Sequence, residues 1–273
     1  MSTSTTCKLF LERDDPTPEL VESPLGEIVV YSARAPGKSL NEDGAGLIWR
    51  DTEGVLAVAD GMGGMASADQ ASRAALESLA ERVSESDDPN APLRHAVLEG
   101  FERANAAVLA LGVGAGTTLT ALVLRDGSGQ SMHAGDSIML HVGQRGRVKA
   151  LTMSHSPTGY AIEAGWLDED DAMHHAERHI ISNFVGFEAM RIELGAAVPI
   201  APRDTLLVAS DGLADNLRLE EIIEIVRKGP LLEAGRRLAE LGRTRMESPQ
   251  PDAPCKPDDL TFVLFRPAQG AGG

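Results

Sequence analysis

Residues 55–67 read VLAVADGMGGMAS, and this stretch is the most informative one for the fold and for a functional site. Five apolar or small residues, typical of a buried strand, run directly into the carboxylate of Asp60. Three glycines follow within four positions, although a turn alone needs only one. Because glycine has no Cβ, the backbone of Gly61, Gly63 and Gly64 can approach a ligand closely or offer a carbonyl to a cation. The stretch predicts an acid held at the end of a buried strand, beside a ligand.

The same arrangement, an acid beside an apolar run, recurs along the chain. The further acids are Asp136 after SMHAG, Asp211 after TLLVAS, Asp258 and Asp259 before LTFVLF, and Glu42 and Asp43 before AGLIW. Taken singly, an Asp-Gly pair after a strand is ordinary turn chemistry. Several carboxylates brought together repel one another unless a cation neutralises them. The set offers oxygen ligands, with no Cys pair or His-x-x-x-His nearby, and so favours Mg²⁺ or Mn²⁺ over Zn²⁺.

The composition excludes several classes of function. The net charge is −16, from 25 basic and 41 acidic residues, which disfavours nucleic acid because binding to its backbone relies on clustered Lys and Arg. Two cysteines, Cys7 and Cys255, are too few for a disulfide framework and fit a reducing cytoplasm. No run of about 18 apolar residues and no apolar leader occurs, so we expect neither a membrane span nor a targeting signal.

Blocks of strands that alternate with pairs of helices predict the fold class. Short branched or apolar runs indicate strands, and apolar residues every three to four positions indicate amphipathic helices. The expected strands lie at 27–33, 45–50, 54–60, 191–198, 205–210 and 260–265, with a strand meander over 117–151, and the expected helices lie at 68–83 (after Ser67 as N-cap), 93–111, 217–229 and 231–245. Such blocks favour an α+β fold of stacked layers, with antiparallel sheets inside and helices outside.

The two ends of the chain and one long connection differ from this pattern. Residues 1–26 are polar and interrupted by proline, and they predict a loosely held arm with one short strand at Lys8–Leu11. Residues 152–190 are too long for an ordinary connection and predict a functional flap. Residues 267–273 are expected to form a disordered tail. A single domain over residues 27–266 remains between the arm and the tail.

Seven short motifs, taken in order, resemble those of a known family. They are NED at 41–43, ADGMGG at 59–64, GTTLTAL at 116–122, HAGDS at 133–137, LTMSHS at 151–156, VASDGL at 208–213 and DDLT at 258–261. Together they are similar to the motifs of the metal-dependent protein phosphatases of the PPM (type 2C) family, in its bacterial form. The resemblance implies a four-layer α-β-β-α sandwich of two antiparallel sheets flanked by helix pairs, with a flap beside a cleft.

The resemblance also implies an activity and the residues that carry it. Proteins of this family hydrolyse phosphoserine and phosphothreonine in proteins at a dinuclear Mn²⁺ or Mg²⁺ centre. Two cations lower the pKa of a bridging water, so that hydroxide attacks the phosphate near neutral pH. By their places in the motifs, Asp60 would bridge both ions and the carbonyl of Gly61 would bind one of them. Asp211 and Asp258 would bind the other ion.

Three more acids receive roles from the same resemblance. Glu42 and Asp43 would hold metal-bound waters. Asp136 matches the position that, with Asp211, binds a third ion in bacterial members. Asp259 stands where the family has Asn, and we prefer Asp258 as the metal ligand because of its place in the motif.

Two departures from the family concern the phosphate and the leaving group. The family has Arg four residues before the Glu of the NED motif, where it grips the phosphate, whereas this chain has Lys38. Lys is a point charge rather than a bidentate fork, and Arg34 is the alternative group for this task. Met62 stands where some members carry His as a proposed general acid, which leaves protonation of the leaving group unassigned. The expected catalytic set is Lys38, Asp60 and Asp211.

The resemblance sets the expected partners and one rival function. We expect phosphoprotein substrates, a cognate Ser/Thr kinase, and a cytoplasmic monomer that binds neither nucleic acid nor membrane. The rival is a catalytically weak family member that binds phosphoproteins or regulates them, and Lys38 keeps this alternative open. A Mn²⁺-dependent assay on a phosphothreonine peptide separates the two.

Two weaker signals receive structural interpretations. Cys7 and Arg13 have the C-x₅-R spacing of cysteine-based phosphatases, but the KLFLE between them is bulky and strand-like and does not form a phosphate cradle. His174, His175 and His179 place two imidazoles at helical i, i+4 spacing, and we interpret them as flap packing rather than a metal site because no acid or Cys completes a set nearby.

Overall fold

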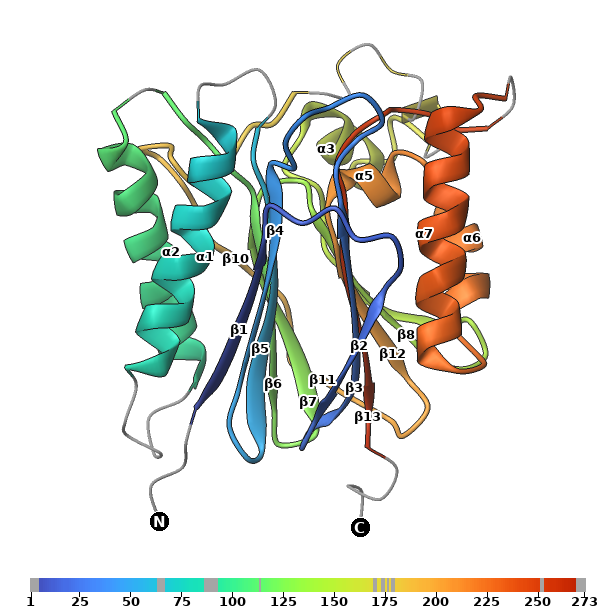
Figure 1. The fold of residues 1–273 in the computed structure, drawn as a ribbon, viewed down its shortest axis with the longest axis horizontal. Coiled ribbons are helices and arrows are strands. Elements are labelled where there is room, and N and C mark those ends of the chain that lie inside the picture. Colours follow the sequence, from blue (N-terminus) through green and yellow to red (C-terminus); the bar gives the residue numbers. More distant parts are fainter. Residues whose placement is uncertain are drawn as a thin grey trace.

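The structure is a computed structural model, and its described part forms two antiparallel sheets with helices on both outer faces (Figure 1). The described residues are 5–62, 67–85, 93–112, 114–168, 171–172, 175, 177, 180–250 and 253–268. Gly63, Gly64, His174 and His179 lie outside them, as does the tail beyond Ala268. Within the described ranges, no helix is long and apolar enough to cross a membrane.

The first sheet, called sheet A, contains the strand that ends at Asp60. Its order is β1-β4-β5-β6-β7-β10, and β11 also pairs with β7. The strands are β1 (Thr6–Leu11), β4 (Asp43–Trp49), β5 (Glu53–Asp60), β6 (Leu119–Arg125), β7 (Ser128–Ala134), β10 (Glu193–Leu194) and β11 (Val198–Pro199). The central strands are buried on both faces, which explains their nearly continuous apolar sequences.

The second sheet, called sheet B, carries the later acids. Its order is β2-β3-β13-β12-β8-β9. The strands are β2 (Glu19–Ser23), β3 (Gly26–Ala33), β13 (Leu260–Pro267), β12 (Thr205–Ala209), β8 (Ile138–Val142) and β9 (Val148–Leu151). The last strand of the chain therefore lies in the middle of this sheet, between β3 and β12.

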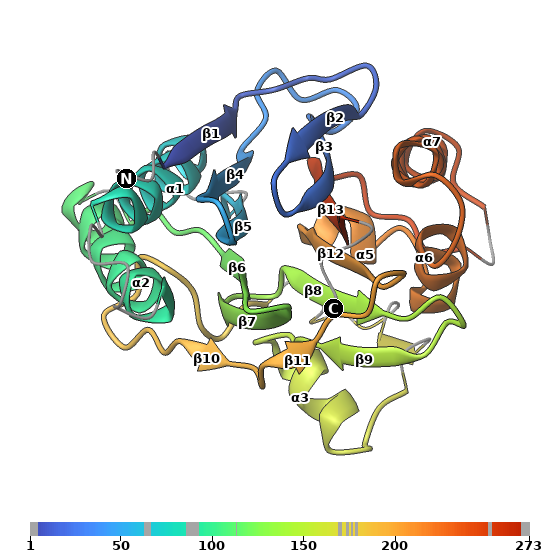
Figure 2. The same cartoon turned by 90° about the horizontal axis from the view of Figure 1, so that it is seen from below.

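The helices cover the outer faces in two pairs, so the predicted four-layer sandwich is confirmed (Figure 2). Sheet A is covered by α1 (Ala68–Ser84) and α2 (Leu93–Ala110), and sheet B by α6 (Leu219–Val226) and α7 (Leu231–Glu247). Two short helices, α3 (Pro157–Glu163) and α5 (Asp211–Ala214), lie at the upper end in Figure 1. Hydrophobic residues fill each interface between layers, including the one between the two sheets.

The N-terminal segment is a part of the sandwich rather than a loosely held arm. The expected short strand is present as β1, and a second strand, β2, was not expected. Both lie at sheet edges, β1 against β4 and β2 against β3. Phe10 and Val21 point into the core between the sheets and are almost fully buried. Burial of these two side chains and the backbone pairing hold the segment in place.

The strands of residues 117–151 form two hairpins in different sheets, so the predicted meander is wrong. The hairpin β6–β7 belongs to sheet A and turns at Asp126-Gly127, where both residues have positive φ. The hairpin β8–β9 belongs to sheet B. The chain changes sheets at Gly135, whose φ of 127° favours glycine and where a Cβ would lie 2.5 Å from the side chain of Thr118. This crossing places Asp136 between the sheets.

The start of α1 also differs from the expectation. Ser67 occupies the N-cap position, but its φ is 60° and its side chain makes no capping hydrogen bond.

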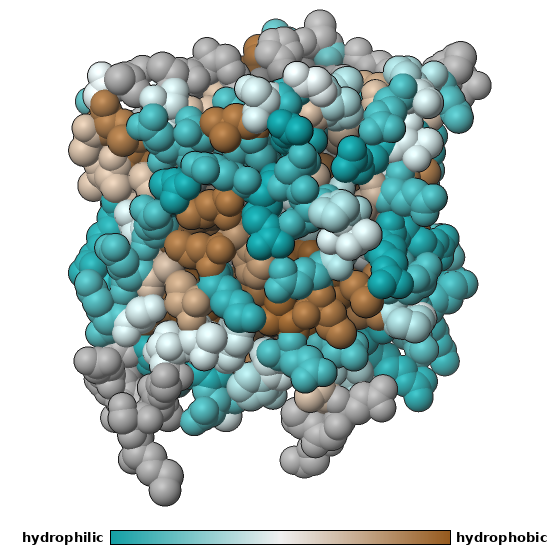
Figure 3. All heavy atoms as spheres, viewed as in Figure 1, coloured by the Kyte–Doolittle hydropathy of each residue, from teal (hydrophilic) through white to brown (hydrophobic). Residues whose placement is uncertain are grey.

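The broad face drawn in Figure 3 is mostly hydrophilic, and hydrophobic residues reach it mainly at mid-height, where the edges of the two sheets face the viewer. Leu20 on the edge strand β2 is an exposed hydrophobic residue.

Candidate metal centre

The predicted acids come from both sheets and meet at one end of the sandwich. Asp43 opens β4 and Asp60 closes β5, and the two residues are paired directly across the sheet. Asp211 follows β12 and begins α5, which lies at the upper end in Figure 1. Asp136 lies on the crossing between sheets, and Asp258 precedes β13. The charges of these five acids influence one another, so the structure brings them together as predicted.

The glycines that follow two of these acids are required by close backbone approach. A Cβ on Gly61 would lie 2.3 Å from the carbonyl oxygen of Ala68 and 2.8 Å from that of Glu42. A Cβ on Gly212 would lie 1.8 Å from the carbonyl oxygen of Asp259. Neither glycine has positive φ, so turn geometry is not the reason for glycine here. Glycine after Asp60 and after Asp211 therefore allows the backbone segments that carry the acids to pack closely.

Asp258 and Asp259 have different surroundings although they are neighbours. Asp259 is buried, and its Oδ1 accepts from the amide of Ala35 at 2.7 Å while its Oδ2 accepts from the amide of Glu42 at 2.8 Å. Asp258 accepts one backbone hydrogen bond, from the amide of Asp259, and otherwise faces the ammonium groups of Lys38 and Lys256. The carboxylate of Asp259 thus ties loops together, and that of Asp258 faces the centre.

Several buried carboxylate oxygens have no hydrogen-bond partner. In the centre they are Oδ1 of Asp43, of Asp136 and of Asp211, and Oδ2 of Asp15 is another such oxygen outside it. The other oxygen of Asp43 accepts from the hydroxyl of Ser210 at 2.8 Å, which fixes the direction of the first. Buried acceptors without a donor are costly, and a hard divalent cation satisfies such oxygens. The donor set consists of oxygens, as Mg²⁺ and Mn²⁺ prefer.

Burial and mutual repulsion shift the pKa values of these acids upwards. Burial raises the pKa of Asp60 and of Asp43 well above the usual range, and the neighbouring carboxylates raise it further. The same two causes raise the pKa of Asp258, and they raise that of Asp136 to about 8. Each shift reflects a negative charge that the protein alone does not fully compensate. The centre is therefore suited to a cation.

Two lysines enter the centre. The Lys38 ammonium donates to Glu42 at 2.8 Å and to Asp259 at 3.1 Å, and lies 3.4 Å from Asp258. Arg34, the alternative for the phosphate, pairs instead with Asp14 at 3.0 Å and donates to the carbonyl of Ser39. The expected residue Lys38 is thus brought to the acids, and Arg34 makes its contacts elsewhere.

Lys256 and Asp215 belong to the centre but were not predicted from the sequence. The Lys256 ammonium contacts the carboxylates of Asp211, of Asp215 at 2.9 Å and of Asp258 at 3.4 Å. Asp215 lies four residues after Asp211, one helical turn further on, and this spacing was a usable signal. Lys256 had a weaker signal, a single basic residue two positions before Asp258.

The raised pKa of Asp136 predicts how the stability of the metal-free protein depends on pH. Its folded-state pKa of about 8 exceeds the value of about 4 in an unfolded chain, so protonation stabilises the fold. This contribution is complete below pH about 4 and is lost as the pH rises through about 8. The melting temperature without metal should therefore fall between pH 6 and about 9. For Asp136→Asn, the melting temperature measured by calorimetry should depend less steeply on pH than for the wild-type protein. An equally steep dependence would contradict a raised pKa for Asp136.

A group of two histidines and an acid also offers close ligand atoms, but its hydrogen bonds oppose a metal. Atoms of His133, His155 and Glu193 lie within 4.8 Å of one another. Nδ1 of His155 accepts from the amide of Gly135 at 3.1 Å and faces the side-chain nitrogen of Asn183 at 2.9 Å. The proton is then on Nε2, which donates to Glu193. A metal at Nε2 would require loss of that proton, so we interpret these hydrogen bonds as structural contacts that hold His155 against Gly135 and Glu193.

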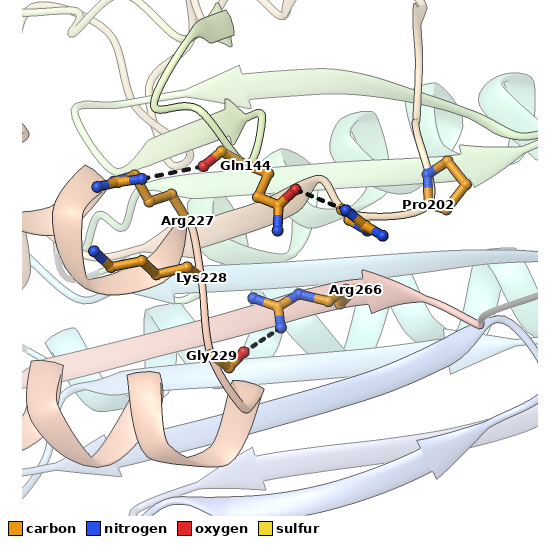
Figure 4. A pocket seen from close by; sticks show the side chains of 7 residues that line it. Gln144, Pro202, Arg227, Lys228, Gly229 and Arg266 are labelled. Atoms are coloured by element: carbon orange, nitrogen blue, oxygen red, sulfur yellow. Dashed lines mark hydrogen bonds between the residues drawn. The ribbon is translucent and has the colours of Figure 1, made fainter.

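A basic hollow lies at the opposite end of sheet B, and its guanidinium groups already have acceptors (Figure 4). Arg266 donates to the carbonyl of Gly229, Arg227 to the carbonyl of Gln144, and Arg203 to the side chain of Gln144. Two of these guanidinium groups thus bind neighbouring backbone carbonyls, and that of Arg203 binds a side-chain amide. We assign no ligand to this hollow.

The sequence matches a protein-family model and several known proteins. A family model described as protein phosphatase 2C matches residues 33–248. The serine/threonine phosphatase stp of Listeria monocytogenes is 30% identical over 201 residues, which cover 68% of this chain and 77% of that protein.

Solved structures show the same fold. The Mycobacterium tuberculosis serine/threonine phosphatase PstP/Ppp has a TM-score of 0.72 and 25% identity, with 88% of this chain and 97% of that chain covered. A structure of the catalytic domain of PstP in complex with two manganese ions has a TM-score of 0.69 and 24% identity, with 88% and 96% covered.

Proposed function

Since the chain belongs to the protein phosphatase 2C family and is a serine/threonine protein phosphatase of the bacterial type, we propose that it cleaves phosphoserine and phosphothreonine esters at a centre of two Mn²⁺ or Mg²⁺ ions. The observation that carries this proposal is the set of buried, unpartnered carboxylate oxygens on Asp43, Asp136 and Asp211. The catalytic domain of PstP, which is similar in fold, was solved with two manganese ions.

The acids of the centre divide into three groups by what they would do for the ions. Asp60 would contact both ions, the carbonyl of Gly61 one of them, and Asp211 with Asp258 the other. Glu42 and Asp43 would hold waters bound to the ions. Asp136 would hold a third ion with Asp211. Support comes from the surroundings of each group, since Asp258 faces the centre and Asp259 is used by backbone amides.

The protein's own residues fix this constellation and attract the substrate. Strand pairing holds Asp43 beside Asp60, and the hydroxyl of Ser210 orients Asp43. When bound, two divalent cations neutralise the phosphate oxygens and supply a water of lowered pKa as the attacking group. The ester P–O bond breaks, and the products are inorganic phosphate and the Ser or Thr hydroxyl. Met62 has no proton to give to the leaving oxygen and packs near Gly116.

The rival function, a weak enzyme that binds phosphoproteins, is favoured by one observation. The ammonium of Lys38 already contacts Asp258, and that of Lys256 contacts Asp211 and Asp258, which are acids that would hold the ions. An ammonium in contact with a metal ligand competes with the metal for its charge. The two functions therefore differ in how well Mn²⁺ enters the centre.

The proposal is tested by hydrolysis of a phosphothreonine peptide with and without MnCl₂. We expect phosphate release that depends on Mn²⁺ and is lost in Asp211→Asn, which removes a charge without changing shape. Peptide binding to the wild-type protein without turnover above the Asp211→Asn level would support the rival. The expected cognate kinase, the monomeric state, the cytoplasmic location and the domain limits 27–266 stay predictions.

Lys38 is predicted to attract the phosphate of the substrate. Lys38→Arg should lower the Michaelis constant for p-nitrophenyl phosphate several-fold, because a guanidinium forms two parallel hydrogen bonds to phosphate. Lys38→Met should raise it by about tenfold, the loss expected for one charge-assisted hydrogen bond. Steady-state kinetics at saturating Mn²⁺ measure both. Arg34→Met serves as the comparison, and a larger effect there than at Lys38 would assign the phosphate contact to Arg34.

A further inference from the structure

A hollow of about 330 Å³ opens directly beside the acid cluster, between the flap and the helices α5 and α6. Three of its lining residues, Asp136, Asp211 and Asp215, belong to the candidate metal centre. Most of the remaining wall is aliphatic. Ile138, Leu151 and Ile162 line it from β8, β9 and α3, and Leu219 and Ile222 line it from α6. The centre and the hollow thus form one continuous depression.

The flap side of the hollow is preformed. The amide of His155 donates to the carbonyl of Gly135 at 3.1 Å, which ties the flap to the crossing between the sheets. Helix α3 has Ser156 as N-cap, whose hydroxyl accepts from the amide of Gly159 at 2.9 Å. A Cβ on Gly159 would lie 2.3 Å from the carbonyl oxygen of Ser154, so the turn is closely packed. A rigid wall reduces the entropy lost when a ligand binds.

The polar residues of the flap wall satisfy one another. The hydroxyl of Ser156 lies 2.8 Å from that of Ser154 and 3.0 Å from that of Thr158. A ligand therefore meets mainly the aliphatic side chains. The volume is at the lower end of the range of about 300–1,000 Å³ for ligand sites, and suits one large side chain with its adjoining backbone.

The charges at the mouth restrict which peptides can enter. Asp136 and Asp215 lie on the side of the centre, and Glu163 lies on the flap. Among the described residues that line the hollow, none is basic. Lys256 compensates the charge of Asp215, so Glu163 is the acid that would repel an acidic side chain here. An aliphatic side chain would bury apolar surface.

We propose that this hollow is a substrate-specificity site, which takes a large aliphatic side chain, such as leucine, from the segment next to the phosphorylated Ser or Thr. This inference rests on the proposed phosphatase function, since a phosphate held at the acids places the neighbouring residues at the mouth of the hollow. Extended residues are spaced about 3.3 Å apart, so a residue within a few positions of the phosphorylated one reaches it. The site discriminates against acidic flanking residues.

The experiment uses phosphothreonine peptides that carry Leu, Ala or Asp at each of the three positions on either side, and p-nitrophenyl phosphate as a substrate without a peptide. At one position, the Leu peptide should have kcat/KM at least about tenfold above the Ala peptide, a usual discrimination for an aliphatic pocket. The Asp peptide should be the poorest. Ile162→Ser should remove the preference for Leu and leave the rate of p-nitrophenyl phosphate hydrolysis unchanged. The conservative variant Ile162→Val should keep the preference for Leu.

The matched control is Tyr160→Ser, on the same helix but outside the hollow and 42% exposed. It should keep the preference for Leu. Equal rates for Leu and Ala peptides, or an Ile162→Ser variant that keeps the preference, would overturn the inference. If p-nitrophenyl phosphate itself is not hydrolysed, the proposed function fails instead. Calorimetry with the wild-type protein and MnCl₂ then decides on the hollow, since the Leu peptide should bind tighter than the Ala peptide and equal binding contradicts the inference.

Discussion

Asp60→Asn is expected to lower kcat/KM toward a phosphothreonine peptide by at least about 10³-fold while the protein stays folded. Asp60 is the acid that would contact both ions, and asparagine keeps its shape but removes its charge. Loss of one shared ligand weakens both cation positions at once. The effect should therefore exceed that of any acid that serves one ion, and steady-state kinetics at several MnCl₂ concentrations measure it.

The same substitution should stabilise the metal-free protein. Burial and the neighbouring acids raise the pKa of Asp60, so its charged form is unfavourable in the absence of a cation. Asparagine removes this repulsion, and the melting temperature without metal should rise. Asp126→Asn, on the exposed turn between β6 and β7, is the matched control and should change neither activity nor melting temperature. Activity near the wild-type level in Asp60→Asn contradicts the assigned centre.

Lys256→Met is expected to change metal binding more than any other substitution of a basic residue. Its ammonium contacts three carboxylates, two of which are proposed metal ligands. At an effective dielectric constant of about 20, two unit charges about 4 Å apart interact by about 4 kcal/mol, so a divalent ion near Asp211 competes with a substantial attraction. Without the ammonium, Mn²⁺ should bind at least about tenfold tighter, which corresponds to about 1.4 kcal/mol.

Calorimetric titration with MnCl₂ measures this affinity without any substrate. The metal-free melting temperature gives a second result, because the acids lose a compensating charge and the fold should be less stable. Lys228→Met serves as the control and should leave both quantities unchanged. Lys228 is an exposed lysine between α6 and α7 and lines the basic hollow at the opposite end of sheet B. Equal Mn²⁺ affinity for wild type and Lys256→Met would show that the ammonium does not compete with the ions.

Much of the fold follows from local sequence patterns. The apolar runs that became β3, β4 and β5 and the periodic segments that became α1, α2, α6 and α7 have the length and spacing that burial on one or two faces requires. The edge strands were harder to recognise. In β1 and β2, only Phe10 and Val21 are deeply buried, and four of the five residues of β2 are exposed or partly exposed. The sheet crossing at Gly135 depends on which strands pair, and no local pattern specifies it.

The sequence by itself determined which residues could bind a cation, because an acid at the end of an apolar run must be held rigidly and partly removed from water. This rule selected Glu42, Asp43, Asp60, Asp136, Asp211, Asp258 and Asp259. Only the family motif favoured Asp258 over Asp259. Only the tertiary structure decided how the neighbouring charges are used. Asp259 is taken by two backbone amides, and Lys256 reaches Asp211 across a gap of 45 residues in the chain. Such contacts depend on distances in space, which the order of residues along a single chain does not contain.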